Sequence, residues 1–332
     1  MRVNLFGIIL SIFGSFITSH GFGQDLVYTQ FYNNPMMLNP AMTGLKKAGR
    51  LAINYRNQWP GLNKAYSSYS IGYDRFFDDY QSGVGIYLFG DNAGNGIWKT
   101  YQAKLNYAYA LDLGDKKSLS MGFDFGIINS SIDAQKLILG EQIDPESGYY
   151  PGFATTDIPE NGYSLTKFDA SVGLLFYSEK IYGGLSFHHA TFPNLKFFKR
   201  EDNLDNTLPL KINLHVGTNF ELIESSRDSW GMSISPVLLL SKQGDFYQLQ
   251  GQALFTYGQL LMGLGARLTP KNTDAALLTI GGVFDYFKIS YSYDLTLSGL
   301  SSRSQGAHEA SLVFSFGDDP GLDINDCMKL FR

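Results

Sequence analysis

The side chains that could do acid–base or metal chemistry are few, and their spacing argues against both. The five histidines are His20, His188, His189, His215 and His308. His188 and His189 are neighbours near the end of an alternating segment, so their side chains are expected on opposite faces and should not bind one metal ion together. His308 and Glu309 are separated in the same way. We therefore predict no catalytic residue, no metal site and no cofactor.

Acidic side chains gather in two segments that are also rich in Pro, Gly and aromatic residues, 137–164 and 192–209. Calcium binding by these acids, binding of another protein, and plain solvated loops all stay open, although the acids do not have the spacing of a calcium loop. Exposed aromatic side chains beside acids are typical anchors in protein recognition, which favours the second interpretation. The candidate partner-binding residues are Trp59, Tyr149, Tyr150, Phe153, Phe197 and Phe198.

The elements that must position these residues are strands, because apolar and polar residues alternate almost everywhere. In 119–127, Phe123 and Phe125 share one face with other apolar residues, while Asp124 and the small residues take the other face. The segments 210–220 and 287–295 repeat this pattern. About fourteen such segments begin near residues 49, 66, 83, 97, 117, 167, 180, 208, 229, 246, 259, 274, 287 and 307.

Charged residues in the middle of the polar faces distinguish a transmembrane barrel from a soluble sandwich, which also alternates. Lys104, Asp124, Lys211 and Arg267 would be costly in a dry sandwich core, whereas a wet lumen accepts them. Aromatic residues lie at the strand ends of many apolar faces, as expected for girdles at the two membrane interfaces. Lipid offers the backbone no hydrogen-bond partner, so a spanning sheet must close on itself. We predict an all-β fold, a closed antiparallel transmembrane β-barrel of about 14 strands.

The lengths of the connections indicate the orientation. The long ones, about 129–166 and 189–207, both follow odd-numbered strands, whereas connections near 178–179, 257–258 and 286–287 are very short. Long outer loops and short periplasmic turns are usual in outer-membrane barrels. The predicted location is therefore the outer membrane, with the lipid bilayer as one partner. A net charge of -5 without a basic block argues against nucleic acid.

The first residues are expected to direct export. Arg2 precedes an apolar stretch of about sixteen residues, short for a spanning helix, and small residues then suit cleavage near Gly23–Gln24. We predict a signal peptide (1–23), an N-terminal plug or periplasmic segment (24–48), a transmembrane barrel (49–317) and a periplasmic tail (318–332). The one cysteine, Cys327, excludes an internal disulfide, and its role stays open.

The stretch "YRNQWPGL" (55–62) ends the first expected strand. Alternation turns Tyr55 towards lipid and Arg56 towards the lumen, while Trp59 falls at the outer interface, where an amphipathic ring is stable. Since the first and last strands must pair to close the barrel, we predict a charge network in the lumen near this seam. Its expected members are Arg50, Arg56, Asp74 and Glu309.

The segment 30–45 contains two Asn-Pro steps, Asn34-Pro35 and Asn39-Pro40. Each places a capping side chain before a residue whose backbone suits a first helical turn. We expect a compact, turn-rich segment, and its apolar residues need burial although no soluble core exists. A plug in the lumen, a periplasmic contact and a simple lead-in to the first strand stay open.

Three stretches together resemble the PorP/SprF family of type IX secretion proteins. They are "QFYNNPMMLNPAMTGL" (30–45), "YRNQWPGL" (55–62) and "SYDLTLSGLSSRSQGAHEASLVFSF" (292–316), and their order and spacing agree from residue 24 to about 316. The motif residues are Asn34, Pro35, Asn39, Pro40, Tyr55, Arg56, Gln58, Trp59, His308 and Glu309.

The resemblance implies an outer-membrane barrel of the secretion and gliding motility machinery of Bacteroidetes. It implies as partners other type IX secretion components and a secreted or cell-surface protein with a C-terminal sorting domain, which the barrel would help to secrete or anchor. It supplies no catalytic residue. The alternative function is a passive channel or small-molecule transporter of the outer membrane.

Overall fold

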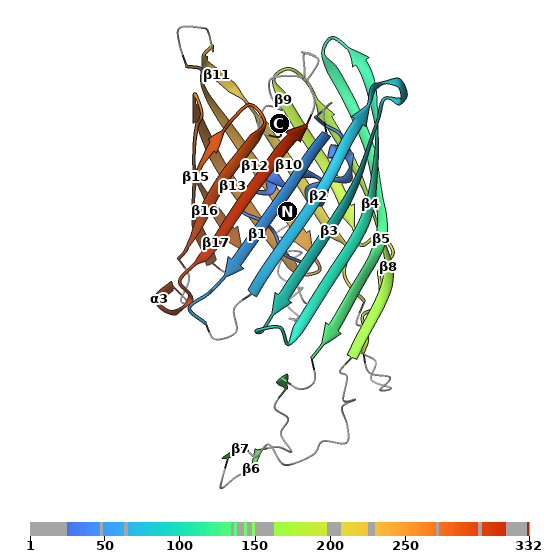
Figure 1. Cartoon of the computed structure of the whole chain (residues 1–332), viewed down its shortest axis with the longest axis vertical. Helices are drawn as coiled ribbons and strands as arrows, with labels where there is room; N and C mark the ends of the chain where they lie inside the picture. Colours follow the sequence, from blue (N-terminus) through green and yellow to red (C-terminus); the bar gives the residue numbers. More distant parts are fainter. Residues whose placement is uncertain are drawn as a thin grey trace, which may run out of the picture.

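The computed structural model describes residues 25–46, 49–62, 66–133, 136–137, 143–144, 148–149, 163–197, 207–224, 230–269, 272–297, 301–316 and 331. No helix in this part of the chain is both long and apolar enough to cross a membrane. Strands dominate instead, and together they form a tall cylinder (Figure 1).

The strands run in sequence order around the cylinder wall. They are β1 (Gly49–Gln58), β2 (Tyr66–Phe77), β3 (Ser82–Ala93), β4 (Trp98–Gly114), β5 (Lys117–Ile132), β8 (Tyr163–Tyr177), β9 (Ile181–His188), β10 (Lys211–Thr218), β11 (Phe220–Ile223), β12 (Met232–Gln243), β13 (Phe246–Tyr257), β14 (Leu260–Thr269), β15 (Asn272–Val283), β16 (Phe287–Thr296) and β17 (Ala307–Phe316). Two short strands, β6 (Ile143–Asp144) and β7 (Gly148–Tyr149), pair with each other outside the wall.

Every neighbouring pair in the wall is antiparallel, and the sheet closes through β1 and β17. β10 and β11 both pair with β12 and are separated only by Asn219, so they act as one interrupted strand. The described residues therefore form a closed barrel of 14 strands, which confirms the predicted fold class. Each strand begins within a few residues of its expected start.

The two ends of the barrel differ in their connections. At the short-turn end, β4 and β5 are joined through 115–116, and β13 and β14 through 258–259. At the long-loop end, which is the lower end in Figure 1, β5 and β8 are joined through 133–162 and β9 and β10 through 189–210. These are the two long connections expected from the sequence. A short helix, α3 (Ser301–Ser304), lies between β16 and β17 at the same end.

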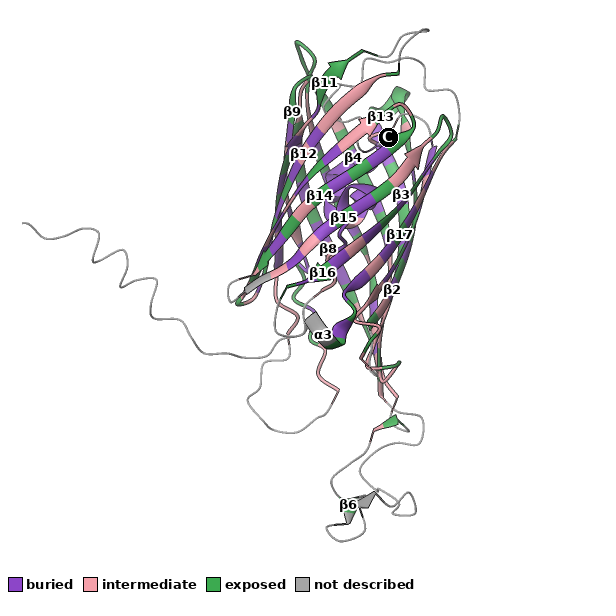
Figure 2. Cartoon of the chain, turned by 90° about the vertical axis from the view of Figure 1, so that its left-hand side faces the viewer, coloured by how far each residue is buried: buried purple, intermediate pink, exposed green. Residues whose placement is uncertain are grey.

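Burial alternates along the strands, as the bands in Figure 2 show. On β5, Phe123 is 45% exposed on the outside, whereas its neighbour Asp124 is 2% exposed inside. Lys104, Lys211 and Arg267 are also buried on the inner face. The outer face is thus apolar and suited to lipid, and the inner face carries the charges.

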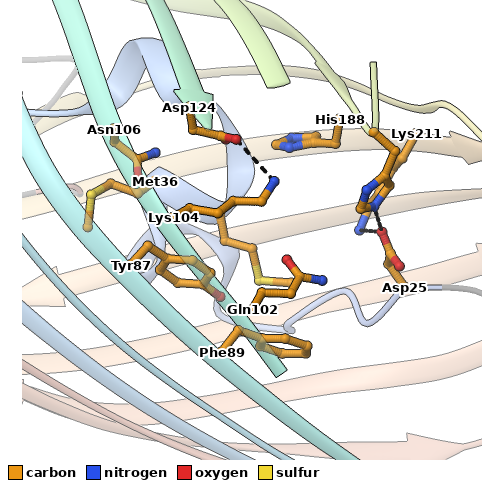
Figure 3. Close-up of a pocket in the computed structure, with 12 residues that line it drawn as sticks. Asp25, Met36, Tyr87, Phe89, Gln102, Lys104, Asn106, Asp124, His188 and Lys211 are labelled. Atoms are coloured by element: carbon orange, nitrogen blue, oxygen red, sulfur yellow. Dashed lines mark hydrogen bonds and ion pairs between the residues drawn. The ribbon is translucent and has the colours of Figure 1, made fainter. Parts of the chain in front are cut away.

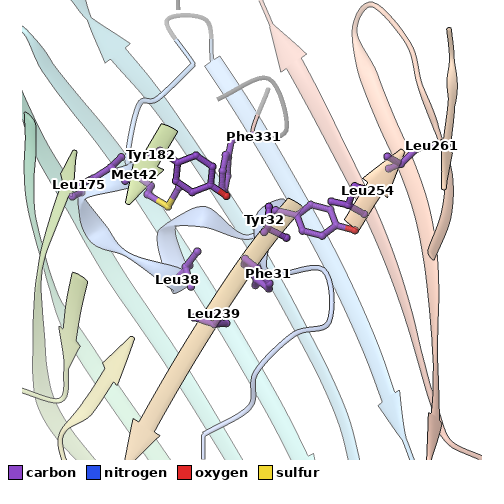
Figure 4. Close-up of a cluster of buried hydrophobic side chains, with 12 residues drawn as sticks. Phe31, Tyr32, Leu38, Met42, Leu175, Tyr182, Leu239, Leu254, Leu261 and Phe331 are labelled. Carbon is purple, nitrogen blue, oxygen red and sulfur yellow. The ribbon is translucent and has the colours of Figure 1, made fainter. Parts of the chain in front are cut away.

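The interior of the barrel is occupied by residues 25–45, which we call the interior segment. It contains the helical turns η1 (Phe31–Asn33), α2 (Pro35–Leu38) and η2 (Pro40–Met42), and nearly all of its side chains are buried. Tyr32, Leu38 and Met42 pack against inward side chains of the wall such as Leu175 and Leu239 (Figure 4). An apolar core therefore forms inside the barrel, in contrast to the wet lumen of an open channel.

The interior segment crosses the barrel from one end to the other. Asp25 contacts His189 and Gln243, which belong to the long-loop end, while Gly44 donates to Asp74 towards the short-turn end. Phe331, in the region predicted as the tail, is buried in the same apolar core with its ring 5.1 Å from that of Tyr182.

Candidate functional site: the anchored interior segment and the long-loop mouth

A buried carboxylate of the last strand holds the beginning of the interior segment. Glu309 accepts hydrogen bonds from the backbone N–H groups of Thr29 (2.8 Å) and Gln30 (2.7 Å). The register of β1 and β17 places Arg56 directly opposite Glu309, and the guanidinium donates to the same carboxylate at 3.1 Å. The motif residue Glu309 therefore accepts hydrogen bonds from both the interior segment and the barrel seam.

Two residues outside the predicted network complete this cluster. Asp294 of β16 accepts from Arg56 (2.8 Å), from Arg267 of β14 (2.9 Å) and from the Thr29 hydroxyl (2.7 Å). The inward orientation of Asp294 and Arg267 could have been predicted from the sequence, because alternation places both on the polar face. Their shared contact with Thr29 could not have been predicted, because side chains of β14, β16 and β1 meet there only when the interior segment is in place.

Arg50 and Asp74 form a second, separate cluster, so the four predicted network residues do not make one network. Arg50 pairs with Asp74 across β1 and β2, with Nη2 2.8 Å from the carboxylate. Asp74 also accepts from the backbone N–H of Gly44, and Arg50 donates to the carbonyl oxygen of Phe331 at 2.9 Å. This cluster fixes the other end of the interior segment and joins it to Phe331.

The two Asn-Pro steps behave differently from each other. Asn39 caps η2, because its side chain accepts from the N–H of Ala41 at 2.9 Å, and its amide donates to the carbonyl oxygen of Leu174. Asn34 makes no side-chain cap, so the expectation of a cap there was wrong. Its amide donates instead to the Ser70 hydroxyl of β2 at 3.0 Å, so the side chain ties the interior segment to the wall.

Charged residues also gather at the long-loop mouth, around Asp25. His189 contacts Asp25 through Nε2 (2.6 Å) and Asp169 through Nδ1 (2.9 Å). Lys104 pairs with Asp169 (2.9 Å) and Asp124 (3.0 Å), as Figure 3 partly shows. Asp25, Lys104, Asp124 and His189 are among the residues that line a cavity of about 430 Å³, a volume that includes space open to solvent.

The structure corrects the expected separation of His188 and His189. Both rings face the interior, with exposures of 6% and 2%. β9 ends at His188, and His189 adopts a positive φ of 60°, which leaves the extended backbone on which alternation depends. Within the described residues no three His, Cys, Asp or Glu side chains are grouped to hold a metal.

The ion pairs of His189 should make the barrel less stable at high pH. Burial lowers the pKa of the His189 imidazole, but Asp25 and Asp169 outweigh it and raise the pKa to about 9, above the ordinary 6.5. The stabilisation is therefore fully present below pH 6.5 and is lost as the pH rises through about 9. Thermal unfolding in detergent should show wild type and His189→Gln differing by about 1–3 kcal/mol at pH 6 and converging near pH 10. A constant difference across this range would contradict the assignment.

The aromatic residues predicted to bind a partner are only partly described. Trp59 lies at the long-loop end with its ring 5.8 Å from that of Tyr66. Phe197 packs against Trp98 (5.6 Å) and Tyr163 (6.4 Å) on the barrel itself. The backbone of Tyr149 belongs to β7. Tyr150, Phe153 and Phe198 lie outside the described residues.

The remaining motif residues surround the seam. Tyr55 is exposed on the outside of β1. Gln58 accepts from Arg56 at 3.4 Å, so it belongs to the edge of the Glu309 cluster. His308 faces outward, where its Nδ1 lies 2.6 Å from the Tyr291 hydroxyl, while the adjacent Glu309 faces inward.

Comparison with solved structures finds other outer-membrane barrels. A toluene transporter, TodX of Pseudomonas putida, has 10% identity and a TM-score of 0.47, covering 90% of this chain and 99% of that one. A FadL homologue of Pseudomonas aeruginosa has 13% identity and a TM-score of 0.43, covering 89% and 98%. The CymD monoaromatic hydrocarbon channel has 12% identity and a TM-score of 0.46, covering 86% and 94%. No curated protein matches this chain.

A family model does match, and it spans nearly the whole chain. Residues 20–314 match the family described as type IX secretion system membrane protein PorP/SprF. The match includes the first two stretches that carried the resemblance and the third as far as residue 314. It also includes Arg56, Asp294 and Glu309 of the first cluster and Arg50 and Asp74 of the second. The protein is therefore a member of the PorP/SprF family of type IX secretion system membrane proteins, a closed β-barrel of the outer membrane.

Proposed function

We propose that this barrel binds one exported protein, through its C-terminal sorting domain, at the long-loop mouth and helps to secrete it or anchor it at the cell surface. The observation that carries the proposal is the filled interior. Residues 25–45 cross the lumen, bury an apolar core and are held at both ends by backbone N–H groups that donate to buried carboxylates of the wall, Glu309 and Asp74. A barrel filled in this way offers its mouths, rather than its lumen, to a protein partner.

The long-loop mouth is the better candidate of the two ends. It carries the connections 133–162 and 189–210, the exposed ring of Trp98 and the motif residue Trp59. Aromatic side chains with exposed area are the residues that most often dominate binding energy at protein interfaces. The short-turn end would then face the periplasm and meet other components of the secretion machinery.

The test is the surface display of the exported protein on whole cells. Replacing residues 145–160 with a short Gly-Ser link should leave the barrel assembled, because no wall strand is altered, but should abolish display of one exported protein. Barrel level is checked by immunoblot and by heat-modifiable migration. Normal display at a normal barrel level would move the binding site to the short-turn end. Loss of several unrelated surface proteins would instead indicate a general defect of the machinery.

The alternative function, a passive channel or small-molecule transporter, is tested by conductance in planar bilayers. A barrel whose interior segment stays in place should pass no steady current, because the buried side chains of residues 25–45 occupy the lumen. Steady channel openings of the wild-type protein would support the alternative and would remove the argument for a protein partner.

A further inference from the structure

His189 stands between the connection 189–210 and the interior segment. Its ring bonds to Asp25 at the start of that segment and to Asp169 on β8. Both ring nitrogens therefore have partners, one on the interior segment and one on the barrel wall. His189 is the first residue after β9, so its ring belongs to the connection and not to the strand.

The backbone next to His189 is held under strain. His189 and Phe192 both have positive φ values, 60° and 48°, which side chains other than glycine rarely adopt. The Ala190 N–H donates to the carbonyl oxygen of Ala170, and the Thr191 hydroxyl donates to Asp169. Such conformations persist only where the surroundings impose them, so the position of His189 depends on its neighbours in the connection.

Phe197 supplies the second attachment of the connection. Its ring contacts Trp98 and Tyr163 edge to face, and these two residues pair with Ile132 from opposite sides, in one row across β4, β5 and β8. Residues 189–197 are therefore fixed to the wall at both of their ends, by His189 and by Phe197.

We propose that His189 is a latch through which the packing of residues 189–197 on the barrel wall controls how firmly the first residues of the interior segment are held. A partner that lifts Phe197 from Trp98 and Tyr163 would shift His189 and loosen Asp25. The latch acts on residues 25–30 and leaves the Arg50–Asp74 cluster, which holds Gly44, unchanged. It operates whether or not the long-loop mouth binds an exported protein.

The test is amide hydrogen–deuterium exchange of the full-length mature barrel in lipid nanodiscs. Phe197→Ala should speed exchange of residues 25–30 about fivefold, because an edge-to-face aromatic contact contributes about 1 kcal/mol. His189→Gln should speed it about tenfold, since the bonds to the two carboxylates weaken. Adding Phe197→Ala to His189→Gln should then change it less than about twofold, because the coupling is already broken.

Two controls accompany these variants. Exchange of residues 40–45 should stay at the wild-type rate in all of them, which shows that the barrel is folded. Phe192→Ala removes a ring that is 53% exposed in the same connection and should leave residues 25–30 unchanged. If Phe197→Ala loosens residues 25–30 equally in both backgrounds, or not at all in the wild-type background, the latch is wrong. Trp98→Ala removes the other side of the same contact and should reproduce the Phe197→Ala result.

Discussion

Glu309→Ala is expected to lower the free energy of unfolding by about 3–5 kcal/mol, the usual cost of removing one partner from a buried ion pair. The carboxylate accepts the N–H groups of Thr29 and Gln30 and the guanidinium of Arg56, all of them buried. Its removal leaves two backbone donors of the interior segment without an acceptor and one cation with a single carboxylate, Asp294.

A double-mutant cycle separates the pair from the rest of the cluster. Arg56→Met combined with Glu309→Ala should cost at least about 1 kcal/mol less than the sum of the two single variants, since neither then leaves an unbalanced charge. Unfolding in urea from lipid vesicles, followed by tryptophan fluorescence, supplies the free energies. Additive costs would show that Arg56 and Glu309 contribute independently. The exposed pair Lys116 and Glu179, 2.9 Å apart, is the matched control and should show coupling of about 0.5 kcal/mol or less.

Gly122→Ala is expected to destabilise the barrel by about 1–3 kcal/mol, because the added methyl group overpacks a filled interior. A Cβ at Gly122 would lie inside van der Waals distance of the backbone of Pro40 and Ala41 in η2. The atoms that the new methyl group would meet belong to the backbone of η2, so no flexible side chain can move aside. The interior segment must therefore shift, and amide exchange of residues 39–43 should rise with the loss of stability.

The control for this variant is Gly183→Ala on β9. The nearest atom to a Cβ at Gly183 is the carbonyl oxygen of His215, at an ordinary contact distance of 3.7 Å. Its effect should stay within about 0.5 kcal/mol, as is usual for substitutions away from packed sites. Equal effects of Gly122→Ala and Gly183→Ala would mean that the interior segment does not press on the wall at η2.

The wall of the barrel could be predicted from the sequence almost strand by strand. Alternation has a period of two, and lipid outside with polar groups inside enforces it on every strand, so a slip of one residue would put Asp124 into lipid. For the same reason Arg50, Arg56, Asp74 and Glu309 could all be placed on the inner face. The closure of β1 on β17 followed from the need to leave no free edge.

What the inward side chains contact was decided only by the tertiary structure. Alternation gives a face but no partner, so it did not show that Arg56 and Glu309 meet Thr29 while Arg50 and Asp74 meet Gly44. It also failed at His189, where one positive φ ends the strand and turns the ring inward. The interior segment has no period of its own, because it is built from single helical turns whose burial depends on the closed wall around them. Its path through the barrel is fixed by contacts between residues more than 200 positions apart, such as Gln30 and Glu309, and no local pattern in a sequence records such contacts.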